Sequence, residues 1–201
     1  MSPAESEADA ERPLRADARR NRDKIVAAAR AAFTTADTAS PENLVPLESI
    51  AREAGVGIGT LYRNFPTREA LVEAVYAAEL DDVTRSAPEL LERFPPDAAL
   101  RAWLDRYGQF SAAKRGMIGT LRAGWSAGRI TPRTRERINA AIETILAAGA
   151  RSGSFRDDVQ ADDVTTMLLG IFLSTAASGG TPEQRTRLLD LLVDALRPHR
   201  R

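Results

Sequence analysis

The sequence has no cysteine among its 201 residues, and its single histidine is His199. A chain without cysteine cannot form disulfides, thiolate metal sites or a cysteine nucleophile. One histidine at the end of the chain also argues against histidine-based catalysis and against a compact metal site. We therefore expect no bound metal and no cofactor.

Long apolar runs are missing as well. No uninterrupted apolar stretch approaches the roughly 20 residues that a membrane-spanning helix needs. The first residues, MSPAESEADAERPLR, are polar and acidic, unlike a secretory signal peptide. The sequence predicts a cytoplasmic protein that does not associate with membranes.

Charge of one sign is not in excess, since 28 basic residues balance 28 acidic ones. A zero net charge argues weakly against a broad nucleic-acid binder, but the charges are unevenly distributed. The first eleven positions carry four acidic residues and no basic one, and a basic cluster follows: Arg12, Arg15, Arg19, Arg20, Arg22, Lys24 and Arg30. This cluster is either an arm that meets backbone phosphates or a solvated helix face.

The most informative stretch is LESIAREAGVGIGTLYRNFPTREAL, residues 47 to 71. Apolar residues recur at helical spacing from Leu47 to Ala54, and Gly55 then stands where a helix commonly ends in a left-handed conformation. A second stripe, formed by Ile58, Leu61 and Phe65, begins after Gly57. The pattern predicts two short helices joined by a tight turn.

The second helix of this pair has a polar outward face. Arginine can donate to guanine O6 and N7 as a fork, asparagine can pair with adenine, and threonine can reach a base edge or a thymine methyl group. Arg63, Asn64 and Thr60 supply these groups, and the hydroxyl of Tyr62 is placed to meet a phosphate. A helix of this type can enter a major groove.

At IAREAGV and GTLYRNFPTREAL the chain resembles the tetracycline-repressor (TetR) family of bacterial transcriptional regulators, over roughly residues 19 to 76. The resemblance implies a three-helix DNA-binding head, a helical body that forms a homodimer, and a small-molecule effector. It assigns DNA contacts to Thr60, Tyr62, Arg63, Asn64 and Arg68, with Gly59 allowing close approach of the backbone. Gly57, Asn64 and Pro46 depart from the commonest family pattern, which puts two phosphate contacts and the base preference in doubt.

We expect an all-α fold with a disordered tail over residues 1–15, a helix-turn-helix domain over 16–66, and an effector-binding and dimerisation domain over 67–201. The linking helix should run from about Thr67 to Leu80. Further helices are expected at residues 89–94, after Asp97 as N-cap, from 132 to before Gly153, at about 161–177 and from 181, with a poor, irregular helix at 116–128.

The apolar residues of the last two helices extend round more of the surface than one neighbour can cover. This predicts a homodimer through a four-helix bundle, against the alternative of an ordinary monomer core. Large aromatic and flexible side chains in the body are candidates for an effector pocket, although each is more often core: Trp103, Tyr107, Phe110, Met117, Leu121, Trp125, Met167 and Phe172.

An enzyme is not expected, because the pairs Asp157-Asp158 and Asp162-Asp163 stand in a loop and at a helix start, where capping explains them. We predict a sequence-specific regulator, acting as a repressor that an effector releases from a pseudo-palindromic double-stranded DNA operator. The alternative is a helical interaction module of the same fold that has lost specific DNA binding.

Overall fold

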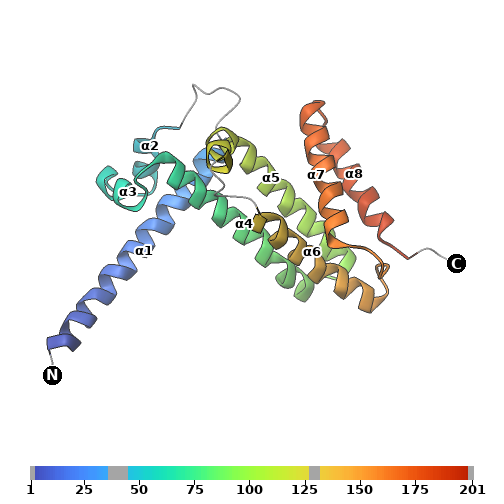
Figure 1. Ribbon diagram of the computed structural model, residues 1–201, viewed down its shortest axis with the longest axis horizontal. Helices are drawn as coiled ribbons and strands as arrows, with labels where there is room; N and C mark the ends of the chain where they lie inside the picture. The colour runs from blue at the N-terminus through green and yellow to red at the C-terminus, as the bar shows by residue number, and fades with distance from the viewer. Residues whose placement is uncertain (1–2, 36–44, 127–131, 199–201) are drawn as a thin grey trace. The chain divides into compact units, whose positions relative to one another are not determined.

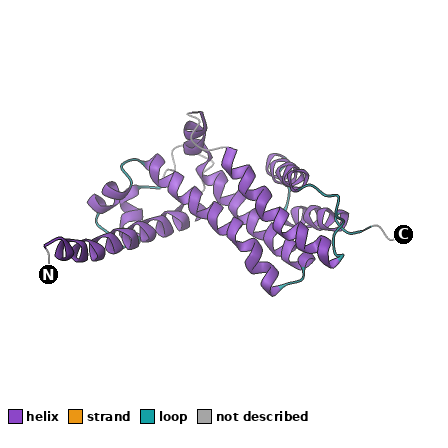
Figure 2. Cartoon of the chain, turned by 60° about the horizontal axis from the view of Figure 1, so that its bottom comes forward, coloured by secondary structure: helices purple, strands orange, loops and turns teal. Residues whose placement is uncertain are grey.

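The computed structural model describes residues 3–35, 45–126 and 132–198 (Figure 1). These ranges consist of helices joined by loops, and they contain no strand (Figure 2). The helices are α1 (Pro3–Thr35), α2 (Leu47–Glu53), α3 (Ile58–Asn64), α4 (Arg68–Arg93), α5 (Pro96–Ser126), α6 (Pro132–Ser152), α7 (Ala161–Ala177) and α8 (Pro182–Ala195). The predicted all-α class is confirmed.

The chain forms two compact units. The first contains Met1–Ala78 and Ala113–Ala127, and the second contains Glu79–Ala112 and Gly128–Arg201. Both α4 and α5 therefore contribute residues to each unit. None of the helices described is long and apolar enough to cross a membrane.

The core of the first unit forms where α1, α2 and α3 meet the start of α4. Apolar residues at helical spacing supply it, as the sequence predicts, because each short helix has only one apolar side to bury. The buried side chains are Ile25, Ala29, Phe33, Ile50, Ala51, Leu61, Phe65, Leu71, Val72, Val75 and Tyr76.

The second unit has its own core, which begins on α4 and ends just beyond α8. The central side chains are Leu80, Val83, Leu90, Leu100, Trp103, Leu104, Ile142, Ile145, Val164, Leu168, Leu189 and Leu192. The indole Nε1 of Trp103 donates to the carbonyl of Val83 at 2.9 Å, so its one polar group is satisfied inside the core.

Helix α1 corrects the predicted N-terminal tail. It begins at Pro3, so residues 3–15 are helical and the prediction of a disordered tail is wrong there. The reason lies in the composition of this segment, because alanine, glutamate and arginine all have high helix propensity. Polar composition alone did not distinguish a helix from disorder.

Helix α4 corrects a second prediction, since it continues through Pro88 to Arg93 without a break into a separate short helix. A proline inside a helix removes one hydrogen bond and costs roughly 3 kcal/mol. The apolar stripe of Leu80, Val83, Ala87 and Leu90 nevertheless continues past Pro88 and is buried along its whole length. Tertiary burial therefore outweighs the local cost.

Helix α5 differs from the prediction at both ends. It starts at Pro96, where the Ala99 amide donates to the Pro95 carbonyl at 2.8 Å, so Asp97 lies in the first turn and is not the N-cap. Its helical backbone extends to Ser126, so the predicted irregular helix is wrong for residues 116–126. Met117 in this part of α5 is buried. Glycine lowers helix propensity, but that cost is tolerated where a helix packs on a core.

The last three helices follow the sequence closely. The bounds predicted for α7 are confirmed, α6 ends just before Gly153, and α8 follows Thr181, whose Oγ1 accepts from the Gln184 amide at 3.2 Å. Gly153 and Gly179 have φ values of 74° and 66°, the left-handed conformation that glycine adopts without strain.

Candidate nucleic-acid interface

The turn between α2 and α3 has the geometry that its sequence predicts. Ala54 caps α2, and Gly55 has a φ of 66°. The amide of Val56 then donates to the carbonyl of Ala51 at 3.0 Å. Gly57 resumes an extended backbone as the N-cap of α3. The glycine at position 55 thus lets the chain reverse within a few residues.

Helix α3 buries one side and exposes the other. Leu61 and Phe65 are 0% and 1% exposed, whereas Tyr62 is 45% exposed. Arg63 is also exposed, and Thr60 and Asn64 are half-buried at the border. Ile58 is 39% exposed, so its predicted place on the buried face is wrong. Ile58 is the first residue of α3, and a helix of this length does not bury every apolar side chain of its stripe.

The polar residues of α3 contact their own helix. Arg63 Nη2 donates to Thr60 Oγ1 at 3.0 Å, and Asn64 Nδ2 donates to the Thr60 carbonyl at 2.8 Å. Since a guanidinium carries five N–H donors, Arg63 retains donors for an external acceptor. The Asn64 amide must exchange its intrahelical bond before both of its donors are available.

Gly59 lies on the exposed surface of α3, and among the described residues a β-carbon built on it would meet no atom within 4 Å beyond its chain neighbours and the backbone of its own helix. Packing within the described part of the chain therefore does not require glycine at this position. The absence of a side chain leaves the backbone of α3 open to close approach by an external partner.

Arg68 makes a contact within the protein that its position in the sequence did not indicate. Its Nη2 donates to the carbonyl of Val45, just before α2, and the side chain is half-buried. Thr67 caps α4, because its Oγ1 accepts from the Ala70 amide at 3.2 Å. One edge of the Arg68 guanidinium therefore braces the start of α2.

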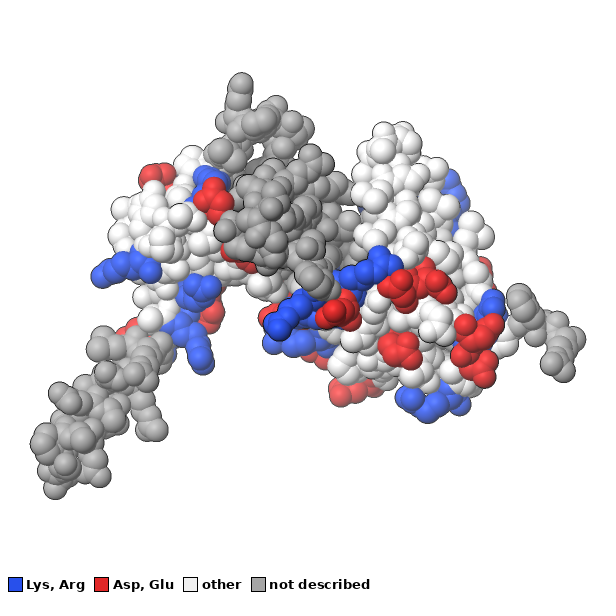
Figure 3. All heavy atoms as spheres, in the orientation of Figure 1, with Lys and Arg blue, Asp and Glu red and all other residues white. Residues whose placement is uncertain are grey.

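The N-terminal basic cluster is partly described. Arg19, Arg20, Arg22 and Lys24 are exposed on α1, and basic side chains project from the first unit in Figure 3. Arg20 pairs with Asp17. The side chains of Arg12 and Arg15 lie outside the described residues.

Arg22 makes a contact that the sequence did not suggest. Its Nη1 donates to the carbonyl of Asn64 at 3.3 Å, and its guanidinium carbon lies 4.4 Å from the centroid of the Phe65 ring. Helical spacing reports only contacts within one helix, so nothing in the pattern connected α1 to the end of α3.

In the second unit, four of the predicted pocket residues are buried together. Trp103 stacks on Tyr107 at 5.6 Å, and Tyr107 lies 5.9 Å from Phe110 and 5.4 Å from Phe172. The rings contact one another directly. They therefore form part of the core between α5 and α7.

The other predicted pocket residues have different surroundings. Met167 of α7 is 47% exposed, unlike the four buried rings, and its assignment to the effector pocket stays a prediction. Met117 is buried but belongs to the first unit. The side chains of Leu121 and Trp125 lie outside the described residues.

A charged group accompanies the aromatic cluster. The Arg185 guanidinium carbon lies 5.6 Å from the Phe172 ring centroid, and Arg185 Nε is buried without a hydrogen-bond partner among the residues described. The sequence gives no indication of a charge near these aromatic residues. Arg185 is on α8, and only the packing of α8 on α7 places it there.

A separate hollow in the second unit is lined by Ala150, Phe155, Arg156, Asp157, Asp158 and Pro198. It holds none of the predicted pocket residues. Arg156 Nε and Nη2 donate to the two carboxylate oxygens of Asp158 at 2.6 and 2.7 Å, and these bonds raise the pKa of Arg156. The Asp157-Asp158 pair is thus part of an ion-paired loop.

Asp162 and its neighbours connect α6 to α7. Arg135 Nε and Nη2 donate to the two Asp162 carboxylate oxygens at 2.6 and 2.8 Å, and Asn139 Nδ2 donates to Asp162 Oδ1 at 2.8 Å. These bonds lower the pKa of Asp162 to about 2. Asp162 therefore stays ionised as a structural partner, and no metal-binding cluster of acidic or histidine residues occurs in the described part of the chain.

Comparison with known proteins gives a consistent result across both units. Residues 25–75 match the family model for bacterial regulatory proteins of the tetR family, and residues 95–198 match the C-terminal domain of SbtR-like transcriptional regulators. A TetR transcriptional regulator from Streptomyces coelicolor is 43% identical, with a TM-score of 0.75 over 89% of this chain and 99% of that one.

Two further relatives are more distant. The TetR transcription regulatory protein from Mycobacterium vanbaalenii is 31% identical, with a TM-score of 0.70 over 92% of this chain and 100% of that one. An HTH-type transcriptional regulator from Staphylococcus aureus is 29% identical over 112 residues. That match covers 55% of this chain and 58% of the Staphylococcus protein, so it spans little more than half of either.

Proposed function

The chain belongs to the tetR family of bacterial regulatory proteins, and we propose that it is a sequence-specific DNA-binding transcriptional regulator of the cytoplasm. The observation that carries this proposal is the division of α3 into two sides. Leu61 and Phe65 are buried, while Arg63 and Tyr62 point outward with Gly59 leaving the backbone bare. A short helix held in this way can be laid into a major groove.

The outward residues have distinct roles in this proposal. Arg63 donates to guanine, Asn64 pairs with adenine after releasing the Thr60 carbonyl, and Thr60 contacts a base edge. Tyr62 donates to a phosphate. Arg68 keeps free donors beside its bond to Val45, so it can add a phosphate contact at the start of α4.

Two copies are needed to read a pseudo-palindromic operator, and we place the dimer contact on α7 and α8. Met167, Leu173 and Leu191 are 47%, 68% and 64% exposed, which is unusual for large apolar side chains. The sequence of α7 has no charged residue after Asp163, and Figure 3 shows an uncharged surface over this helix. An exposed apolar surface of this kind is typical of an interface.

We further propose that a small-molecule effector binds in the second unit beside the cluster of Trp103, Tyr107, Phe110 and Phe172 and releases the protein from DNA. The guanidinium of Arg185, with its unpaired buried Nε, favours an effector that brings an acceptor oxygen. An apolar site with one oriented polar group is the usual composition of a ligand pocket.

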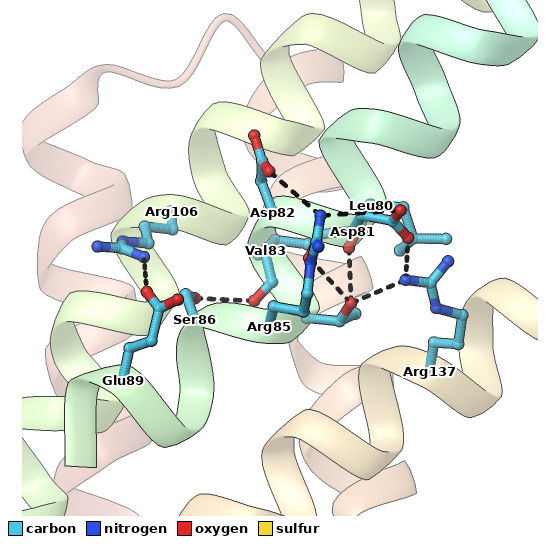
Figure 4. Close-up of polar contacts among 10 residues, drawn as sticks. Leu80, Asp81, Asp82, Val83, Arg85, Ser86, Glu89, Arg106 and Arg137 are labelled. Carbon is cyan, nitrogen blue, oxygen red and sulfur yellow. Dashed lines mark hydrogen bonds and ion pairs between the residues drawn. The ribbon is translucent and has the colours of Figure 1, made fainter. Parts of the chain in front are cut away.

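Helix α4 is the element through which we expect this effector to act, since it contributes to both units. Within the second unit, Arg137 of α6 donates to Asp81 and, at 3.0 Å, to Thr84, and Arg106 of α5 pairs with Glu89 at 3.9 Å (Figure 4). These contacts fix the second half of α4 to its neighbours. A shift of α5 or α6 on effector binding would therefore also move α4.

A gel-shift experiment with promoter DNA flanking the protein's own gene tests the proposal. A regulator should shift a promoter duplex at protein concentrations that leave a scrambled duplex free, and Arg63→Ala should reduce this preference. Equal, weak binding to both duplexes by the unaltered protein would favour the helical interaction module. Tryptophan fluorescence during titration with candidate effectors then tests the ligand site, since a true effector must change DNA affinity by the same factor as DNA changes effector affinity.

A further inference from the structure

Helix α3 has few means of holding itself in place. It spans only Ile58–Asn64, and helices this short are unstable on their own. Its N-cap, Gly57, offers no side-chain hydrogen bond to the free amides. The position of α3 must therefore come from contacts with the rest of the first unit.

Arg22 of α1 supplies two such contacts at the C-terminal end of α3. Its Nη1 donates to the carbonyl of Asn64 at 3.3 Å, one of the carbonyls that a helix end leaves without an intrahelical partner. Its guanidinium also lies 4.4 Å from the centroid of the Phe65 ring, within the range of a cation–π contact. The positive charge further suits the negative end of the helix dipole.

The two contacts act on consecutive residues with different environments. Phe65 is 1% exposed, so its ring is part of the core, while Arg22 itself is exposed and lies over it. Asn64 is the last residue of α3 and follows Arg63 directly. The Arg22 side chain therefore joins α1 to the part of α3 that carries both of the proposed base-reading side chains.

We propose that Arg22 is a positioning residue for DNA recognition, which fixes the end of α3 so that Arg63 and Asn64 meet the base edges in register. This inference rests on the proposed function of α3. Recognition side chains have to be held within about 0.5 Å of their productive geometry by the residues around them. Arg22 thus sets sequence preference without contacting a base.

The obvious rival role for Arg22 is a phosphate contact, since it belongs to the basic cluster of α1. Lysine separates the two roles. Its ammonium group keeps the charge that a phosphate attracts, but it lacks the planar fork that both stacks on a ring and donates to a carbonyl. Arg22→Lys should therefore preserve a phosphate contact and lose the positioning contact.

The experiment uses the full chain, an operator duplex selected with the unaltered protein from a random pool, and a random duplex of equal length. Affinity for each is measured by fluorescence anisotropy at several salt concentrations. We expect Arg22→Lys to weaken operator binding about 10-fold, from loss of the cation–π contact and the charge-assisted hydrogen bond. Its affinity for the random duplex and its salt dependence should stay unchanged.

Three further variants complete the design. Arg151→Lys changes an exposed arginine of α6, outside the basic cluster, and should leave operator binding unaltered. Phe65→Leu removes the ring but no charge and should reduce operator preference in the same direction as Arg22→Lys. The double variant should then lose less than the product of the two single effects, because both changes disrupt one contact.

Several outcomes would overturn the proposal. Operator affinity of Arg22→Lys equal to that of the unaltered protein would contradict it, and so would full additivity with Phe65→Leu. Equal weakening on both duplexes in Arg22→Ala, with a salt slope lower by about one, would make Arg22 a phosphate contact. If Arg63→Ala leaves the operator preference intact, the proposed role of α3 fails instead. If Arg22→Lys does not fold, amide hydrogen exchange is measured on Phe65→Leu instead. Faster exchange in α3 with unchanged exchange in α1 supports the proposal, and unchanged exchange in α3 rejects it.

Discussion

The ring of Phe155 occupies the space beside Gly149 that a side chain at that position would need. A β-carbon built on Gly149 would lie 2.7 Å from Phe155 Cγ and 2.8 Å from Cε2. The Gly149 carbonyl also accepts from the amides of Ser154 and Phe155 at 2.9 and 3.1 Å, so the chain folds back tightly after α6. Glycine is required here by packing, since its backbone conformation is not left-handed.

Gly149→Ala should therefore lower the free energy of unfolding. Overpacking a core costs about 1 to 3 kcal/mol, which outweighs the gain of about 0.5 to 1 kcal/mol that alanine brings to a helix interior. Urea unfolding measures the change. Combining it with Phe155→Leu should give less than the sum of the two losses, and strict additivity would show that the ring is not the obstacle.

Gly59→Ala should have the opposite effect on stability and a strong effect on function. No atom of the described residues outside its own helix backbone and chain neighbours lies within 4 Å of the added carbon, so the variant should be as stable as the original or more stable by up to about 1 kcal/mol. Operator affinity should fall, because the methyl group occupies space that we assign to DNA. Retention of full operator affinity in gel shifts would mean that the backbone at Gly59 does not approach DNA closely.

Arg63→Ala should weaken binding to the operator by about 1 to 3 kcal/mol and relax the preference at one base pair of each half-site, as expected for loss of a bidentate base contact. Binding to all single-base operator variants checks both effects. An equal loss on specific and random DNA would instead assign Arg63 to the phosphate backbone.

Leu173→Glu should convert the proposed dimer to a monomer, because it places a charge in the apolar surface of α7 that we assign to the interface. Sedimentation or light scattering at fixed protein concentration measures the change. Ala140→Glu, which adds the same side chain to an exposed position of α6, is the control and should leave the assembly unaltered. A Leu173→Glu variant with unchanged mass would exclude this part of α7 from the interface.

Asp162 should contribute an acid-dependent stability. Bonds from Arg135 and Asn139 lower its pKa in the folded protein from 3.8 to about 2. Because the folded value lies below the unfolded one, the contribution is present above about pH 4 and disappears as the pH falls toward 2. Asp162→Asn should flatten the curve of unfolding free energy against pH in this window, and an identical acid limb in both proteins would contradict the assignment.

The sequence by itself determined the elements whose signals are local. The turn at Gly55, the cap at Thr181 and the bounds of α7 follow from helical spacing and from the few residues that begin or end a helix well. The outward residues of α3 could be named in advance for the same reason, because a helix of known start places Arg63 and Leu61 on different sides.

Only the tertiary structure decided where burial overrides local preference and which distant residues meet. Helix α4 continues through Pro88 because its apolar stripe is buried on both sides of the proline. Arg22 contacts Asn64 and Arg185 lies beside Phe172 because helices remote in sequence pack together, and no periodicity within one helix carries that information. The same physical limit explains Met167, which the sequence could identify as apolar but not as exposed.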